Sequence, residues 1–169
     1  MTIKRVYAFI AISIMLVSGC ASAPPADSGI WITGISESVT RYYIPATIWQ
    51  ERTNRSVTCR SDMTYIDEPD RPVVCNISFF NKNTVPKEVL SLYFTANDKM
   101  YPLNNINTMF TRTEYGEIRV TSVIDLSEIL DLFRSDAIVL KAVIDSAEYT
   151  FIPNNEFMRY RTLFLEALR

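Results

Sequence analysis

The 169-residue sequence contains no histidine, only four glycines and only three cysteines. The absence of histidine excludes Ser-His-Asp and Cys-His nucleophilic catalysis, histidine general bases and almost every zinc site. Four glycines do not form a glycine-rich phosphate-binding loop. An enzyme built from this chain would depend on carboxylates, Lys, Tyr or Ser alone, and we expect neither a bound metal nor a cofactor.

The sequence also lacks an apolar run long enough to cross a bilayer as a helix. Its longest apolar run, Val6–Val17, has about 12 residues, fewer than the ~20 that a membrane-spanning helix needs. Lys4 and Arg5 precede the run, and Leu16-Val17-Ser18-Gly19-Cys20 ends it. This segment resembles a bacterial lipoprotein signal peptide with its lipobox. The resemblance covers residues 1–20 and implies that residues 1–19 are removed and that Cys20 carries covalent lipid.

The same resemblance implies a place in the cell envelope. In lipoproteins of bacteria with two membranes, an aspartate directly after the lipidated cysteine usually marks retention in the inner membrane. Ala21 stands at that position, so we expect a lipid anchor in the outer membrane, facing the periplasm. Residues 20–29 include Pro24 and Pro25 and predict a semi-extended tether. Residues 30–169 are then a single β-rich periplasmic domain.

The charge balance of the mature chain argues against nucleic acid. Removal of residues 1–19 takes away Lys4 and Arg5, which leaves 15 basic residues against 19 acidic ones and a net charge of −4. An acidic domain has no electrostatic reason to bind nucleic acid. We expect its partners to be the membrane, through the lipid, and another envelope protein.

Two cysteines remain beyond Cys20. Cys59 and Cys75 each fall on the apolar side of an alternating segment, and export would place them in an oxidising compartment. We predict a disulfide between them, worth roughly 3 kcal/mol in the chain-entropy model for a loop of about 16 residues. A reactive thiol pair and a metal site are the alternatives, which the spacing disfavours.

Apolar residues alternate with polar ones along most of the chain, which predicts strands. The predicted strands span residues 39–50, 56–65, 73–80, 88–96, 99–103, 117–124, 137–144 and 148–152. Pro45 lacks an N–H, so the first of them is an edge strand or contains a bulge. A short helix is predicted near 126–134 and a C-terminal helix near 155–168. This order predicts a mainly β domain, a β-sandwich of which an immunoglobulin-like arrangement is one form.

Residues 104–116 are polar and predict a loop longer than most in compact domains, a length that is often functional. Near its middle, Met109 and Phe110 either pack inward or present an apolar tip to a partner. The partner-binding candidates in this stretch are Asn105, Met109, Phe110, Arg112 and Tyr115.

Two other groups of residues suggest different chemistry. Glycoside hydrolysis needs two acids that face each other across a cleft. One cluster of acids could supply them: Asp62, Asp67, Glu68 and Asp70. We interpret this cluster as part of a solvated turn. Sugars and peptides stack on aromatic platforms. Four residues are candidates for such a platform: Trp31, Tyr42, Tyr43 and Trp49. Packing of these side chains in the core is the alternative.

The sequence favours a non-catalytic, membrane-anchored envelope lipoprotein that binds another protein as an accessory or inhibitory subunit. A carbohydrate- or peptidoglycan-binding module is the first alternative. A carboxylate-dependent hydrolase is the second.

Overall fold

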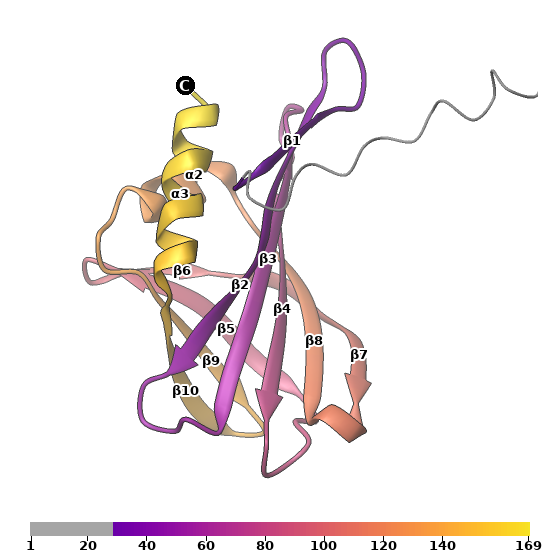
Figure 1. Ribbon diagram of the computed structural model, residues 1–169, viewed down its shortest axis with the longest axis vertical. Helices are drawn as coiled ribbons and strands as arrows, with labels where there is room; N and C mark the ends of the chain where they lie inside the picture. Colours follow the sequence, from indigo (N-terminus) through magenta and orange to yellow (C-terminus); the bar gives the residue numbers. More distant parts are fainter. Residues whose placement is uncertain (1–28) are drawn as a thin grey trace, which may run out of the picture.

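The computed structural model describes residues 29–169, which form ten strands and two α-helices (Figure 1). The predicted mainly β domain and both predicted helices are confirmed. The strands are β1 (Trp31–Gly34), β2 (Thr40–Glu51), β3 (Val57–Ile66), β4 (Val73–Asn81), β5 (Val89–Ala96), β6 (Lys99–Pro102), β7 (Asn104–Arg112), β8 (Glu117–Ile124), β9 (Val139–Ile144) and β10 (Ala147–Pro153). The helices are α2 (Leu126–Phe133) and α3 (Asn155–Ala167), and a 3-10 turn, η1, spans Thr113–Tyr115.

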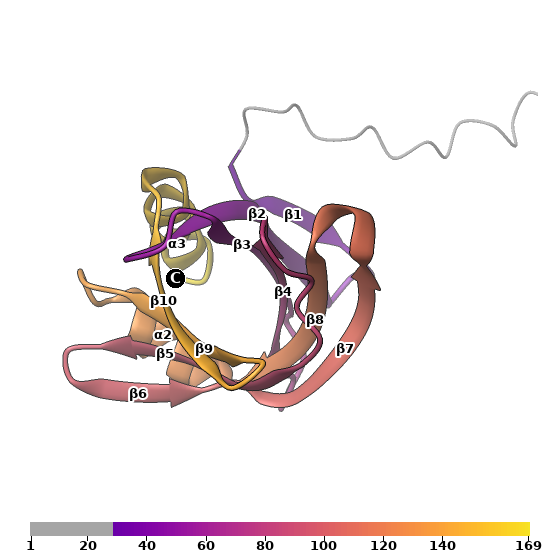
Figure 2. The same cartoon turned by 90° about the horizontal axis from the view of Figure 1, so that it is seen from below.

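All ten strands belong to one antiparallel sheet. Its order is β6-β5-β9-β10-β2-β3-β4-β8-β7, and β1 pairs with β2 beside this path. Seen from the end, the sheet curls into a nearly closed, barrel-like ring (Figure 2). The strands therefore form one continuous sheet rather than the two facing sheets of the predicted sandwich, and an immunoglobulin-like arrangement is not confirmed.

Leu103 brings the two edges of the sheet together. It is the single residue between β6, at one edge, and β7, at the other. Because consecutive Cα atoms are only about 3.8 Å apart, the edges must meet at this point. The Leu103 side chain is buried, and its amide donates a hydrogen bond of 2.9 Å to the carbonyl of Leu92 on β5.

The predicted irregularity at Pro45 is present. The register between β2 and β3 shifts between Ile44 and Thr47, which is a β-bulge. Along its other edge, β2 pairs with β1 up to Tyr43 and with β10 from Trp49 onward. Pro45 lies in the gap between these two partners, so no backbone hydrogen bond is lost because of its missing N–H.

Both helices lie at one end of the ring (Figure 1). The Asn154 side chain caps the start of α3 by accepting a hydrogen bond of 2.9 Å from the Phe157 amide. Phe133 of α2 lies 5.7 Å, centroid to centroid, from both Phe157 and Phe164 of α3. Trp49 of β2 lies 4.5 Å from Phe157, so the helices cover that end of the hydrophobic core with aromatic rings.

The predicted disulfide is absent. Cys59 and Cys75 are free thiols, fully buried on the core side of β3 and β4, as the alternation predicts. However, Cys59 lies opposite Phe79, and Cys75 lies opposite Met63. Side-chain alternation gives the face of a strand but not its register along the neighbouring strand, and the register keeps these thiols apart.

The predicted loop at 104–116 is also corrected. Residues Asn104–Arg112 form strand β7, and η1 and Gly116 complete the connection to β8. Gly116 adopts φ +58°, and a Cβ atom there would collide with the backbone carbonyl of Asn81. This position therefore requires glycine.

Candidate functional site

β7 is an edge strand that carries four of the five partner-binding candidates. It pairs with β8, and among residues 29–169 no strand pairs with its other edge. Seven of its nine side chains are exposed, and Ile106 is the one β7 side chain that packs against the hydrophobic core of the described residues. Bulges at Asn104/Asn107 and Thr108/Phe110 interrupt its register with β8. The strand is therefore held from one side only and offers both its side chains and its free edge.

The structure brings two of the candidates together. The Arg112 guanidinium lies 4.5 Å above the centre of the Phe110 ring, and it also lies 3.7 Å from the Glu117 carboxylate. Phe110 is half-buried, whereas 53% of the Met109 surface is exposed. Met109 is thus an apolar side chain held out in solvent, the second of the two arrangements expected from the sequence.

The other two candidates lie apart from this pair. Asn105 is exposed near the start of β7, in the left-handed conformation at φ +55°. Tyr115 lies in η1, beyond the end of the strand, and is 65% exposed. The five predicted residues therefore follow one edge of the sheet without converging on a pocket.

A polar network next to β7 was not predicted from the sequence. On the outer face of the sheet, the Asp62 carboxylate of β3 accepts a hydrogen bond from Arg119 of β8 and another, of 2.8 Å, from the Asn76 amide of β4. Arg119 also donates to the Ser78 hydroxyl of β4 at 3.0 Å. Asp62 and Ser78 are buried although they point away from the core. Only the pairing of β3, β4 and β8 places these residues together.

The predicted aromatic platform divides between two environments. Trp31 and Tyr43 lie on the outer face with ring centroids 4.9 Å apart, and Trp31 is 38% exposed. Burial raises the pKa of the Tyr43 hydroxyl, the Asp62 charge raises it further, and Arg119 opposes both. Tyr42 and Trp49 belong to the core. Half of the platform is therefore available to a ligand.

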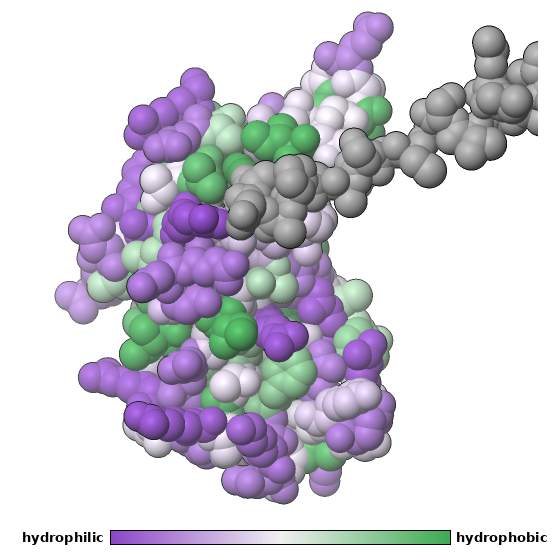
Figure 3. Space-filling model, viewed as in Figure 1, coloured by the Kyte–Doolittle hydropathy of each residue, from purple (hydrophilic) through white to green (hydrophobic). Residues whose placement is uncertain are grey.

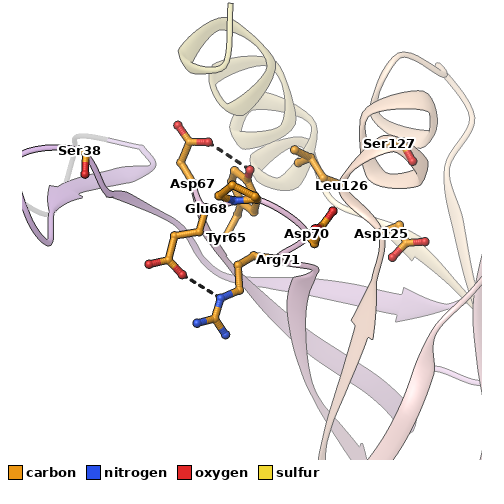
Figure 4. Close-up of a pocket in the computed structure, with 10 residues that line it drawn as sticks. Ser38, Tyr65, Asp67, Glu68, Asp70, Arg71, Asp125, Leu126 and Ser127 are labelled. Atoms are coloured by element: carbon orange, nitrogen blue, oxygen red, sulfur yellow. Dashed lines mark hydrogen bonds and ion pairs between the residues drawn. The ribbon is translucent and has the colours of Figure 1, made fainter.

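The predicted carboxylate cluster does not form a pair of facing acids. Asp62 is held by Arg119, while Asp67 and Glu68 line an open pocket of about 770 Å³ (Figure 4). Their carboxylates point in different directions: Asp67 accepts a hydrogen bond of 3.2 Å from the Tyr65 hydroxyl, and Glu68 pairs with Arg71 at 2.8 Å. This geometry fits the solvated turn rather than an acid and a nucleophile across a cleft.

Residues 29–169 contain neither a metal-binding cluster nor a membrane-spanning helix. This part of the chain contains no group of three or more Cys, Asp or Glu side chains arranged to hold a metal ion. It also contains no helix with the length and apolar character needed to cross a bilayer. On the face shown in Figure 3, hydrophobic residues form small groups between hydrophilic ones. A binding site on this face would therefore be a small local group of residues rather than one broad apolar surface.

Comparison of the chain with protein-family models, curated proteins and solved structures finds no match.

Proposed function

We propose that this protein is a non-catalytic, lipid-anchored envelope lipoprotein that binds another envelope protein along strand β7, as an accessory or inhibitory subunit. The observation that carries the proposal is the open edge of β7, with Met109 exposed beside it.

An edge strand is a natural docking site, because its unpaired N–H and C=O groups can bond to a partner backbone and its side chains supply selectivity. The same property makes an unprotected edge prone to aggregation. The two bulges of β7 limit indiscriminate pairing of this edge with other strands. Side chains must therefore contribute to recognition in addition to the backbone edge, which gives the exposed Met109 a role that packing does not explain.

The anchor supports a role at the membrane. In the proposed mature protein the lipid on Cys20 lies about nine residues before Gly29, where the described chain begins. A proline-bearing segment of that length spans about 20–30 Å at ~3 Å per residue. The domain would therefore meet partners close to the periplasmic face of the outer membrane.

A carbohydrate- or peptidoglycan-binding module remains the second candidate, and one observation favours it. Trp31 and Tyr43 form an aromatic pair on the outer face, with ring planes tilted by 40°, and aromatic rings are the surfaces on which sugars pack. Binding of muropeptides that is lost in Trp31→Ala would favour this candidate. The geometry offers the carboxylate-dependent hydrolase no comparable support.

The proposed function is tested by crosslinking in the native envelope and purification through the lipoprotein. Wild type should recover one dominant protein, and the double variant M109S/F110S should recover at most about a tenth as much. Met100→Ser is the matched control, because Met100 is 58% exposed on β6. It should recover the partner normally.

Folding of the variants is checked separately. Because Met109 is exposed, M109S should leave the melting temperature within about 2 °C of wild type. Equal recovery by wild type and M109S/F110S, or equal loss in Met100→Ser, would contradict docking at β7.

A further inference from the structure

The strands next to the β7 edge carry an uneven distribution of charge. β3, β4, β7 and β8 contain three arginines, Arg60, Arg112 and Arg119, and two acids, Asp62 and Glu117. All five side chains lie on the outer face, as the cross-strand pairs show. We call this surface the arginine face and define it by Arg60, Phe80, Phe110, Arg112 and Arg119.

The acids of this surface lie beneath the arginines. The Asp62 and Glu117 side chains are only 7% and 8% exposed, whereas that of Arg112 is 53% exposed and that of Arg119 is 22% exposed. Arg60 is also exposed, and within the described part of the chain no carboxylate forms an ion pair with it. An approaching molecule therefore meets positive charge, although the chain as a whole has a net charge of −2.

Two of the guanidinium groups are held over aromatic rings. Arg60 lies 5.5 Å from the centre of the Phe80 ring, and Arg112 lies 4.5 Å from that of Phe110. A guanidinium stacked in this way keeps its N–H groups free at the edge and loses little further freedom on binding. Planar carboxylates match that edge with paired hydrogen bonds. Aromatic residues and arginine are also the residues most enriched in binding hot spots.

We propose that the occupant of the arginine face is an acidic segment of the partner protein, with carboxylates on Arg60 and Arg112 and an apolar or aromatic side chain beside Phe110 and Met109. This inference rests on the proposed function and names the chemistry of its partner. Charge complementarity selects an acidic occupant. The adjoining free edge of β7 favours a polypeptide over a glycan or a nucleic acid, since a polypeptide backbone can bond to that edge.

The test uses the mature protein and a fluorescent copolymer peptide of Glu and Tyr as the probe. We expect the probe to bind the wild type, and the double variant R60E/R112E to bind at least about tenfold more weakly. The affinity should also fall as salt rises. Arg159→Glu is the matched control, because Arg159 lies 5.2 Å over the Tyr160 ring on α3, away from this face. It should bind the probe like the wild type.

Other outcomes would overturn the inference. If R60E/R112E does not fold, as judged by circular dichroism, the pair R60Q/R112Q replaces it with the same expectation. Equal weakening in Arg159→Glu would show that only overall charge matters. Heparin that competes as well as the peptide would show a general anion-binding surface.

Failure of this inference can be told from failure of the proposed function. Capture of the envelope partner that is lost in M109S/F110S but kept in R60E/R112E would retain the docking edge and reject the acidic segment. If M109S/F110S captures the envelope partner as well as wild type does, both the docking edge and the acidic segment would be rejected.

Discussion

Cys75 lies opposite Met63 on the neighbouring strand, four residues out of register with Cys59. Four residues of strand span roughly 14 Å, whereas a disulfide requires Cα atoms within about 7 Å of each other. Both thiols are fully buried, and burial raises the pKa of each. The pair is therefore kept reduced by the geometry of the sheet, in a domain that we propose to reside in an oxidising compartment.

We predict that neither thiol reacts with iodoacetamide in the folded protein and that both react within minutes in denaturant. Thiolate is the reactive form, and a raised pKa combined with burial removes it. Peptide mapping of each alkylated cysteine measures this directly. A peptide pair linked through Cys59 and Cys75, recovered from protein that was never unfolded, would contradict the β3–β4 register.

The lipid anchor is tested at Cys20. If Cys20 carries the proposed lipid, replacing it by alanine removes the thiol that would be modified, so Cys20→Ala should abolish incorporation of labelled palmitate and release the protein from the membrane fraction. Cys59→Ala is the control and should label normally, since its thiol is buried. Unchanged labelling of Cys20→Ala would reject the lipobox interpretation.

The Asp62–Arg119 pair should contribute to stability. Asp62→Ala removes a buried carboxylate and leaves Arg119 and Asn76 without their acceptor, and we expect a loss of about 2 kcal/mol in urea unfolding. Asp67→Ala, at an exposed aspartate, should cost less than about 1 kcal/mol. Equal effects of the two changes would show that the outer-face network contributes nothing.

Glu51 should make the stability of the fold depend on pH. Burial alone would raise the pKa of its carboxyl, but hydrogen bonds from the Asn54, Thr53 and Thr150 amides and the Thr53 hydroxyl lower it. A folded pKa below the unfolded value of about 4.3 means that the stabilisation is present above that pH and is lost as the pH falls through the folded pKa.

Glu51→Gln should therefore destabilise the protein by about 1–2 kcal/mol at pH 7, and the difference from wild type should shrink at pH ~3. Urea unfolding at both pH values measures it. Glu148→Gln, at an exposed residue, is the control. A difference that stays constant between the two pH values would contradict the role assigned to the Glu51 carboxylate.

Strands that bury one face were predictable from the sequence, and exposed strands were not. β3 and β4 alternate apolar and polar residues because one side of each faces the core. β1 exposes all four of its side chains and β7 exposes seven of nine, so their sequences show no alternation, and β7 was predicted as a loop for this reason. Closure of the sheet depends on the single linking residue Leu103, which no local pattern reveals.

The same limit applies to the candidate site. Met109 and Arg112 were found because they lie in a polar stretch longer than most loops of compact domains, and loops of that length are often functional. The contact of Arg119 with Asp62 joins residues 57 positions apart, and only the order of β3, β4 and β8 brings them together. A search for arginine and aromatic residues at alternate positions of β7 would have found the stacked pair, but not its continuation on β3 and β4.

Site-specific photocrosslinking in living cells tests the central claim most directly. A photoreactive amino acid in place of Met109 should form one dominant adduct with an envelope protein, while the same amino acid in place of Met100, which is similarly exposed, should not. That result would establish β7 as the docking edge. The same adducts from both positions, or none from Met109, would contradict it.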